Sequence, residues 1–478
     1  MSHGSRPAPI AARPDPTAHQ TAARRATLIW IALLLAILVW DGWNNRYAWQ
    51  SARGWEQEEI AQSLATGHGF SFAARYRWLF SRSTTPDPDP WTAARGAQHY
   101  FPTAWESPLQ PLLIAGASVS AGAYWGRFLV VACQAAFLLA TAVLVFLLGR
   151  AVFEWRTGMI ASLILLLEPH VVRLAFGTLT SATLAGLAVT TAACATLWCL
   201  RAISWRRALL LGAVLGGCLL ASGATLLFIP VAVLLILLAP RGRGRMAWRA
   251  AVIVPAAAAV VISPWVIRNF LTFHQLVVDH DGFGEIALSG NPLLAETFTP
   301  GLHVCGAAPP PFTAVNGLAA VERARSNGGQ KAMYAMADEC VRQDAPPGYD
   351  RMNEAERDRV YLHHAESFAA AHPRLFATLT ADKALAFFYT GWRPYVRLLA
   401  LLALAGIVLT LRRPGPRALL LLVLTYSIPY VLAIPYFPRY RAPVEPLLLL
   451  FAIYPLAVLT SYCLRLAHRG EGRAGVRS

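Results

Sequence analysis

Three glutamates stand close together soon after the first long apolar run of the chain. The stretch GWEQEEIAQSLATGHGFSF, residues 54–72, contains Glu56, Glu58 and Glu59 at the start of a segment with helical periodicity. A positioned carboxylate can take the proton of a hydroxyl group, which is a poor nucleophile until it is deprotonated. An acid in the first turn of a helix is also favoured by the helix dipole. The pattern therefore leaves two interpretations of Glu56, as a helix-capping acid or as a catalytic base.

The periodicity of residues 56–68 predicts a helix with one apolar face. At about 100° per residue, Ile60 and Leu64 fall on that face, and Glu59 falls on the opposite face, where we expect it to meet water. Glu56 lies on one flank of the apolar face and Glu58 on the other. We expect the helix to lie along a membrane surface, so that a carboxylate on its flank points towards the boundary between protein and lipid.

The composition is that of a membrane protein. Of the 478 residues, 56% are hydrophobic and only 14% are charged, whereas about 25% are charged in soluble domains. The formal net charge is +16, but the arginines gather at the ends of apolar runs, as the positive-inside rule describes. We therefore predict an all-α polytopic membrane protein whose partner is the lipid bilayer and not nucleic acid.

About ten apolar runs are long enough, or nearly so, to cross a bilayer, which takes about 20 residues. They lie at residues 26–43, 126–149, 157–174, 179–201, 207–222, 224–240, 248–264, 395–411, 418–435 and 444–463. The division between the fifth and sixth runs is the weakest, because only Ser222 and Gly223 separate them.

The arginines assign the sides of the membrane. Arg24 and Arg25 precede the first run, and Arg465 and Arg469 follow the last, which predicts that both termini are cytoplasmic. The expected order is a disordered cytoplasmic tail (1–25), a transmembrane module (26–264), an outer segment (265–394), the last transmembrane helices (395–464) and a cytoplasmic tail (465–478). A bacterial-type inner (plasma) membrane fits this arrangement.

Two long stretches remain on the outer, or periplasmic, side. We name them the first outer segment, residues 44–125, and the second outer segment, residues 265–394. Loops of this length in compact proteins are commonly functional, so we expect the active site on this face, in a cavity between the two segments. Cys305 and Cys340 both lie in the second outer segment, and an oxidising compartment would allow them to form a disulfide.

Four motifs in order resemble the GT-C superfamily of integral membrane glycosyltransferases. They are IAQSLATGHGFSF (60–72), TAWESPLQPLL (103–113), SPWVIRNF (263–270) and FPRYRAPVEPLLLL (437–450). The resemblance is to the branch that contains protein O-mannosyltransferases and the lipid A aminoarabinose transferase, and it extends over nearly the whole chain. It implies a GT-C-like fold with interfacial helices in both outer segments.

The resemblance also implies a reaction. A polyprenyl-phosphate-linked sugar would enter from the outer leaflet, and a carboxylate of the first outer segment would deprotonate a hydroxyl of a lipid, glycan or protein acceptor. The hydroxyl would attack the anomeric carbon with inversion. The family acid is commonly an aspartate about three residues further upstream, where this chain has Arg53. We therefore expect Glu56 to be the catalytic base, and Glu58 and Asp41 are the alternative candidates.

Cations are needed to hold the anionic phosphate of such a donor. Arg268, Arg439 and Arg441 are expected near the outer membrane surface, where arginines in short loops are otherwise avoided, and Lys383 is a fourth candidate. Anchoring to lipid headgroups is the alternative for the arginines, and snorkelling from a surface helix is the alternative for the lysine.

Further polar residues of the motifs are expected to bind the acceptor or to line the cavity. They are Glu106, His68, Asn269 and Tyr440, and an exposed loop acid is the alternative for Glu106. The histidines of the outer segments show no metal-binding spacing, so we predict no zinc site and no cofactor. A divalent metal held by the outer carboxylates stays an alternative.

Other functions are also compatible with a polytopic membrane protein. A transporter or flippase of lipid-linked or small solutes would be expected to show internal repeats and charges at mid-membrane, and the sequence has neither clearly. A polymerase or ligase of lipid-linked glycans would use similar chemistry. A non-catalytic scaffold is the interpretation that a dispensable Glu56 would favour.

Overall fold

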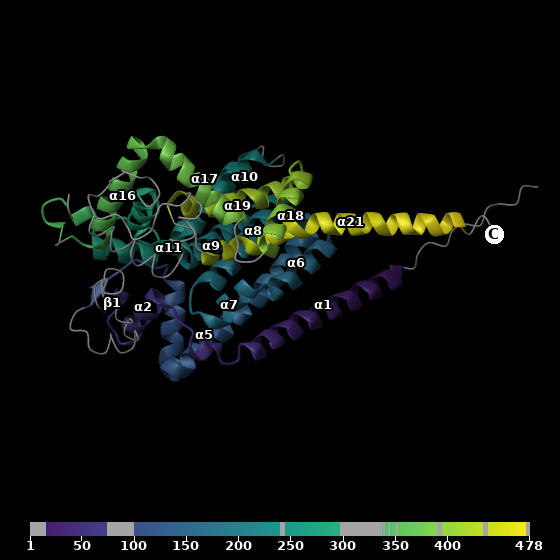
Figure 1. The fold of residues 1–478 in the computed structure, drawn as a ribbon, viewed down its shortest axis with the longest axis horizontal. Helices are drawn as coiled ribbons and strands as arrows, with labels where there is room; N and C mark the ends of the chain where they lie inside the picture. Colours follow the sequence, from purple (N-terminus) through teal and green to yellow (C-terminus); the bar gives the residue numbers. More distant parts are fainter. Residues whose placement is uncertain are drawn as a thin grey trace, which may run out of the picture.

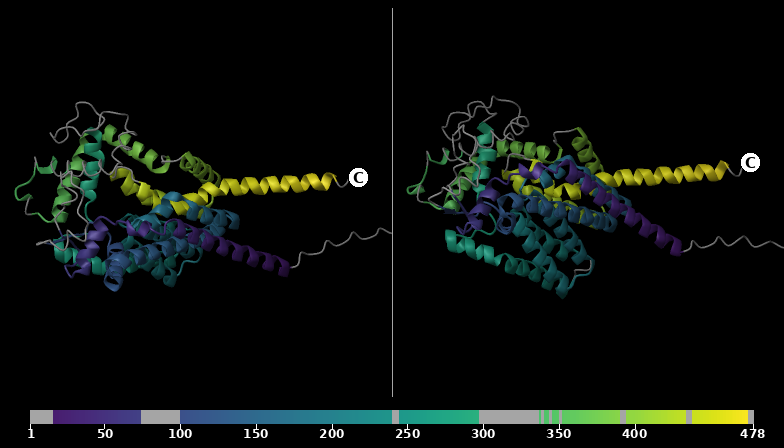
Figure 2. Two further views of the ribbon diagram at one scale, coloured as in Figure 1. Left: turned by 60° about the horizontal axis from the view of Figure 1, so that its bottom comes forward. Right: turned by 90° about the horizontal axis from the view of Figure 1, so that it is seen from below.

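The structure is a computed structural model that describes residues 16–73, 100–239, 244–296, 337, 340–342, 345–349, 352–389, 394–433 and 438–474. Helices run along the long axis of the molecule, and both α1 and α21 extend towards the end where the termini lie (Figure 1). Helices α2 and α16 and strand β1 lie at the opposite end. The two further views place the purple helix α2 and the green helix α16 at that same end (Figure 2).

The first half of the chain forms helices and one small sheet. Its elements are α1 (Pro16–Asn44), α2 (Glu56–Ala65), β1 (Ser71–Phe72), β2 (Phe101–Pro102), α5 (Leu109–Val152), α6 (Trp155–Leu167), α7 (Pro169–Gly177), α8 (Ala182–Arg201) and α9 (Trp205–Ala221). Strands β1 and β2 pair antiparallel, Ser71 opposite Pro102 and Phe72 opposite Phe101. A 3-10 helix, η1 (Ala48–Gln50), lies between α1 and α2.

The second half is helical wherever it has regular structure among the residues described. Its elements are η2 (Gly223–Leu227), α10 (Phe228–Leu238), α11 (Arg245–Phe273), α12 (Phe283–Leu288), the π-helical turn η4 (Ser289–Leu293), α13 (Leu294–Glu296), α16 (Glu354–Ala371), α17 (Pro373–Tyr389), α18 (Pro394–Thr410), α19 (Pro414–Ala433), α20 (Pro438–Arg441), η6 (Ala442–Val444) and α21 (Glu445–Ala474).

The all-α polytopic architecture is confirmed. Each of the ten apolar runs overlaps a helix, and in the described parts of the chain six helices are long and apolar enough to cross a membrane. The pair α6 and α7, bent by 55°, adds a seventh span if it crosses as one. The other three runs, at 207–222, 224–240 and 395–411, correspond to shorter helices. If these helices do not cross the membrane, the number of spans is smaller than the ten that we expected.

Direct contacts join the two outer segments. The backbone N–H of Asp281 donates to the carbonyl of Ala104 over 2.8 Å. A carboxylate oxygen of Glu354 accepts from the Thr103 hydroxyl and the Ala104 N–H, each over 2.9 Å. These bonds fix the backbone on the N-terminal side of Glu106, so the position of that acid depends on the second outer segment.

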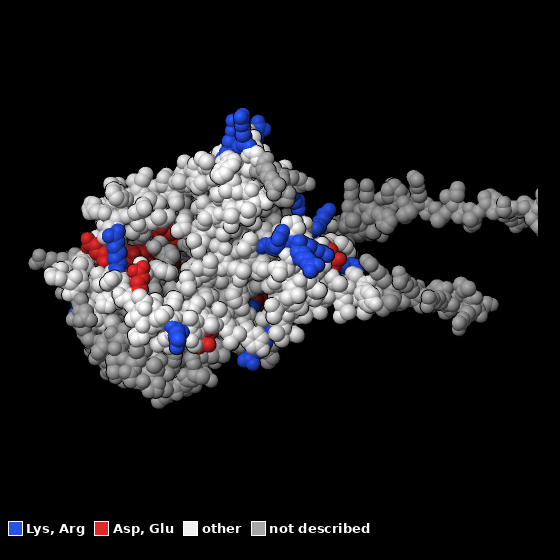
Figure 3. Space-filling model, turned by 90° about the horizontal axis from the view of Figure 1, so that it is seen from above, with Lys and Arg blue, Asp and Glu red and all other residues white. Residues whose placement is uncertain are grey.

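Charge is distributed unevenly along the molecule. In Figure 3, Asp and Glu side chains gather around a hollow at the end away from the termini, and Lys and Arg side chains gather nearer the termini. This separation is the one that the positive-inside rule describes if the terminal end faces the cytoplasm. The orientation itself stays a prediction.

Candidate active site

The entry to α2 is strained at the residue before Glu56. Trp55 has φ 44° and ψ −116°, and positive φ is unfavourable for a bulky residue. Strained backbone of this kind tends to occur at functional sites. The preceding Arg53 forms a bridge with Thr178, and its carbonyl accepts from the Leu179 N–H over 2.9 Å, so the turn between α7 and α8 holds the start of α2.

Helix α2 is enclosed by protein on all sides over its first two turns, which corrects the expectation that one face meets water. Glu59 is buried and its carboxylate accepts from the Ala73 N–H over 3.2 Å. The helical wheel was wrong here because the chain after α2 folds back over the face opposite Ile60.

The buried carboxyl group of Glu56 and the partly buried carboxyl group of Glu106 form the centre of the site. Burial raises the pKa of Glu56, and the positive charge of Arg439 opposes that shift. Burial and the charge of Glu56 raise the pKa of Glu106 to about 7. The side-chain amide of Gln57 donates to Glu106 over 2.9 Å and to the Ser181 hydroxyl over 3.2 Å. Because the two acids repel each other in a dry site, the pair favours holding one proton near neutral pH.

Arg439 supplies positive charge beside this pair. Its guanidinium interacts electrostatically with both Glu56 and Glu106, and it donates to the Tyr440 hydroxyl over 2.9 Å. The Tyr440 ring in turn stacks on Tyr430, with centroids 4.9 Å apart. The aromatic rings hold the guanidinium without neutralising it, which leaves its charge available to the carboxylates or to a bound anion.

The pair of Asp279 and His280 was missed by the sequence analysis, which tested histidines only for metal-binding spacing. His280 Nδ1 lies 2.7 Å from Asp279 Oδ2, and the Ser107 hydroxyl donates to the same oxygen over 2.9 Å. Burial acts to lower the pKa of His280, but the hydrogen bond and charge of Asp279 and the charges of Glu106 and Asp358 outweigh it, and the pKa is raised. The neighbouring letters DHD were the available signal.

Two buried acceptor atoms of this site lack a hydrogen-bond partner among the residues described. They are Gln57 Oε1 and Asp279 Oδ1, on side chains that are 5% exposed in each case. Buried acceptors without a donor are costly. Both atoms suit a ligand that brings hydroxyl or N–H donors.

Glu58, the first reserve for the catalytic role, is engaged in a structural ion pair. Its carboxylate accepts from Arg127 of α5 over 2.8 and 3.2 Å and from the Gly54 N–H over 3.2 Å. The side chain is fully buried. This pairing ties α2 to α5 and leaves Glu58 poorly suited to act as a base.

Arg268 and Asn269, predicted for the donor phosphate and the cavity, are used to hold backbone. Arg268 donates to the carbonyls of Phe70 and Thr103 over 2.6 and 2.7 Å, and to the Asn269 side chain over 2.9 Å. The Asn269 amide donates to the Val277 carbonyl over 3.1 Å. Together they fasten both outer segments to the end of α11.

Arg441 and Lys383 also have partners within the protein. Arg441 Nε lies 2.9 Å from a carboxylate oxygen of Glu445. The Lys383 ammonium donates to the Asn291 side chain over 2.6 Å and to the carbonyls of Leu432 and Gly290 over 2.9 and 3.2 Å. Burial lowers the pKa of Lys383 to about 7. These contacts assign both cations to the packing of α17, α19 and α21.

Asp41 and His68 lie on other parts of the chain. Asp41 is in α1, two residues before the exposed Trp43. His68 follows the far end of α2, stacks on Tyr100 with centroids 3.6 Å apart, and is exposed. The length of α2 separates His68 from Glu56 by roughly 15 Å or more.

Cys340 is disulfide-bonded. Cys305 lies outside the described residues, so the pairing Cys305–Cys340 stays a prediction.

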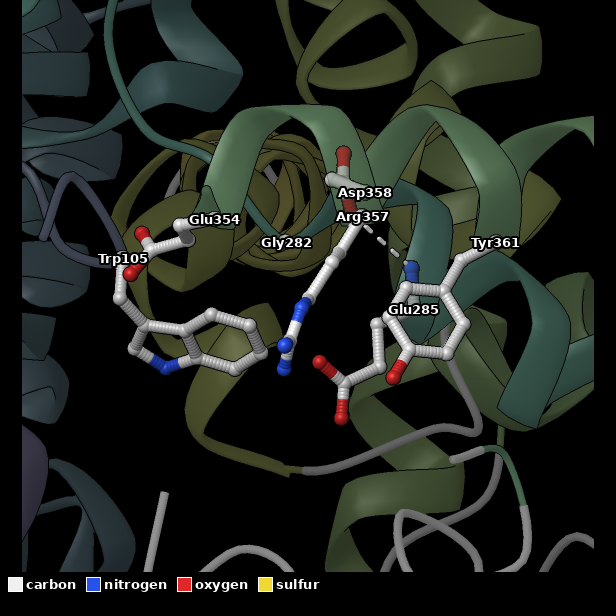
Figure 4. Close-up of a pocket in the computed structure, with 7 residues that line it drawn as sticks. All are labelled: Trp105, Gly282, Glu285, Glu354, Arg357, Asp358 and Tyr361. Carbon is white, nitrogen blue, oxygen red and sulfur yellow. Dashed lines mark hydrogen bonds between the residues drawn. The ribbon is translucent and has the colours of Figure 1, made fainter. Parts of the chain in front are cut away.

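A narrow pocket is lined by Trp105, the residue before Glu106. Figure 4 shows the Arg357 side chain extending between the ring of Trp105 and the carboxylate of Glu285. Asp358 accepts from the Glu285 N–H over 3.0 Å. The pocket is also lined by Gly282, Glu354 and Tyr361. Trp105 precedes Glu106, so the pocket and the carboxyl pair share one backbone stretch.

In the portion of the chain that the structure covers, no group of three or more His, Cys, Asp or Glu side chains is arranged to hold a metal ion. The described carboxylates of the outer segments therefore do not form a site that fits a divalent metal.

Solved structures resemble this fold over most of the chain. The oligosaccharyltransferase AglB from Archaeoglobus fulgidus, in complex with an inhibitory peptide and a dolichol-phosphate, aligns with a TM-score of 0.50 and 14% identity over 94% of this chain and 52% of that one. The chain shares the fold of AglB over this alignment. ArnT from Cupriavidus metallidurans in the apo state aligns with a TM-score of 0.34 and 16% identity over 91% of this chain and 78% of that one.

The likeness to AglB shows the fold alone, because the identity is low and this chain spans about half the length of AglB. No family model matches the sequence. The search of curated proteins likewise found no match.

Proposed function

We propose that this protein is a membrane glycosyltransferase that moves a sugar from a polyprenyl-phosphate donor to an acceptor hydroxyl at the outer face of the membrane. The observation that carries the proposal is the interacting pair of Glu56 and Glu106 with Arg439 beside it, at the junction of the two outer segments. Acid–base chemistry needs the carboxyl pair, and an anionic leaving group needs the arginine.

In this reaction Glu56 acts as the general base. Its carboxylate accepts the proton of the acceptor hydroxyl while that oxygen attacks the anomeric carbon of the donor sugar. The bond between the anomeric carbon and the phosphate oxygen breaks, the configuration inverts, and the electron pair leaves with polyprenyl phosphate. Arg439 stabilises the negative charge that develops on the phosphate. Burial supports this role because it raises the pKa of Glu56 towards the working pH.

The unpartnered acceptors Gln57 Oε1 and Asp279 Oδ1 support a polyhydroxylated ligand, because sugar hydroxyls donate hydrogen bonds. The shared fold also supports a lipid-phosphate donor, since AglB of the same fold was solved with a dolichol-phosphate. The acceptor is a lipid, a glycan or a protein, and the sugar is a hexose or a pentose. The active face is the periplasmic or outer one, and both termini are cytoplasmic.

The test is release of polyprenyl phosphate from a panel of polyprenyl-phosphate sugars by the full-length protein in lipid nanodiscs, with membrane extract as the source of acceptor. Turnover of at least one donor is the expected result. Absence of both turnover and saturable donor binding over the whole panel would contradict the proposal. Movement of an intact donor across a bilayer without release of phosphate would instead identify the transporter or flippase.

A further inference from the structure

The proposed base leaves one step unexplained, which is the removal of the proton it has accepted. After the sugar is transferred, the proton of the acceptor is on the Glu56 carboxyl, which is 8% exposed. The next residue, Gln57, donates to Glu106 and to the Ser181 hydroxyl, and of these two only Glu106 is an acid that can pass a proton on. A further titratable group is needed between the pair and the solvent.

His280 reaches solvent and lies within the influence of the Glu106 charge. Its side chain is 34% exposed, whereas Asp279 beside it is 5% exposed. The Ser107 hydroxyl, on the residue after Glu106, donates to the same Asp279 oxygen that His280 Nδ1 contacts. The same Asp279 oxygen therefore orients the His280 ring and accepts from Ser107, the residue that follows Glu106 in the sequence.

The fold keeps this pair in place by a close approach of another segment. A Cβ atom on Gly223 would overlap both the Asp279 carboxylate and the His280 ring. Helix α9 ends at Ala221, Ser222 interrupts the helical structure, and η2 begins at Gly223. The interruption of the apolar run at 222–223 thus makes room for Asp279 and His280.

We propose that His280, oriented by Asp279, passes the acceptor's proton from the Glu56 and Glu106 pair to solvent. The inference rests on the proposed glycosyl transfer. Glu106 gives its proton to the free Nε2 of neutral His280, Glu56 then gives the proton it accepted to the Glu106 carboxylate, and the imidazolium releases its proton to water or buffer. Three proton transfers return every group to its starting state. His280 acts through Glu106, and it is a positioning and relay residue with no contact to the reacting atoms.

The groups that face His280 are consistent with this path. Asp279 and Glu106, which flank the site, and Asp358 of α16 all carry negative charge when ionised, and each favours the imidazolium. An imidazole in this setting holds a proton readily and still exchanges it through its exposed edge. The pKa of Glu106 is raised to about 7, so its carboxyl holds a proton near neutral pH that it can pass on.

The test uses the donor-release assay with a donor that the wild type turns over. If the wild type turns over no donor, the proposed function fails, and this result is distinct from a failure of the role of His280. His280→Ala is expected to lower kcat about 10-fold to 100-fold and to leave the donor KM unchanged, since proton transfer contributes at that scale. Added imidazole should restore part of kcat in His280→Ala and none in Glu56→Gln. His363→Gln, an exposed histidine of α16, is the matched control and should behave as the wild type.

A second variant keeps the inference testable if His280→Ala does not fold. Asp279→Asn retains the shape of the side chain but removes the charge that raises the pKa of His280, so the acid limb of the pH–kcat profile should move to lower pH. An unchanged kcat in His280→Ala, a loss of kcat that imidazole does not restore, or an unmoved acid limb in Asp279→Asn would each overturn the inference.

Discussion

Glu56 and Glu58 are two residues apart on α2 and have opposite surroundings. Glu58 is fully buried and is met by Arg127 at 2.8 Å, with the Gly54 N–H as a further donor. Glu56 makes no ion pair within 4.0 Å among the residues described, and it shares its site with a second acid, Glu106. A buried carboxylate with a full set of partners stabilises a fold. One that is left with a like charge has a shifted pKa and suits chemistry.

The arginines of the last motif differ in the same way. Arg441 is bound by Glu445 through the side chains, one helical turn apart. Arg439, two residues earlier, is held by the Tyr440 hydroxyl and keeps its charge directed at Glu56 and Glu106. Residues with the same chemistry and nearly the same position in sequence therefore serve structure in one case and the site in the other.

The largest expected effect is at Arg439. Replacing it by Gln removes the cation beside the carboxyl pair, and we expect kcat/KM for the donor to fall about 100-fold to 1000-fold, the scale for losing one transition-state charge contact. Arg439→Lys should recover part of this. Arg441→Gln is the comparison, and it should lower thermal stability more than kcat/KM. An Arg439→Gln enzyme with wild-type kcat/KM would remove the distinction between the two arginines.

Glu58→Gln should act on stability and not on chemistry. It leaves the Arg127 guanidinium at the α2–α5 contact without its carboxylate, and breaking a buried pair from one side costs about 3 kcal/mol. Thermal or denaturant unfolding in detergent measures the loss, and kcat of the folded fraction should change by less than about 3-fold, which corresponds to well under 1.4 kcal/mol. A Glu58→Gln protein of normal stability and no activity would transfer the role of base to Glu58.

Glu106→Gln should change the pH dependence of kcat. Its carboxylate repels that of Glu56, so its removal lowers the pKa of the base. The base works when deprotonated, and burial raises its pKa above the ordinary value of a glutamate, so wild-type activity should fall as the pH drops through that raised pKa. In Glu106→Gln this limb should move to lower pH, with kcat at high pH reduced about 10-fold because a relay group is lost. A limb that stays in place would show that the two acids do not interact.

The smallest expected effect is at Asp281, a third buried acid near the site. Burial and the charges of Asp358 and Glu354 raise its pKa from 3.8 to about 9. Because the unfolded chain releases this proton first, the stabilisation is fully present below about pH 4 and is lost as the pH rises from there to about 9. Asp281→Asn should unfold at a temperature that depends less on pH over this range, with kcat unchanged. An Asp281→Asn protein whose unfolding temperature depends on pH as strongly as that of the wild type would contradict this.

The sequence was sufficient for the helices and for part of the site. Apolar periodicity located the helices, and the motifs pointed to Glu56, Glu106, Arg439 and Tyr440, which the structure brings together. These residues lie at the ends of predicted helices, where local pattern and function coincide.

Long-range contacts decided the rest. Arg268, Arg441 and Lys383 have the charge that a phosphate needs, but their partners are backbone carbonyls and a glutamate that sequence spacing does not identify as such. The Asp279 and His280 pair depends on Gly223, which is more than fifty residues earlier in the chain. Glu59 is buried because a segment beyond β1 covers it, and a helical wheel treats the helix as if it were alone.

The most direct test of the account compares Glu56→Gln with the wild type in the donor-release assay, on protein whose folding is verified by thermal unfolding. Gln keeps the size and burial of the side chain and cannot accept the proton. The account predicts a loss of kcat of about 100-fold to 10,000-fold with normal stability, the range for a general base. Wild-type kcat in folded Glu56→Gln would contradict it.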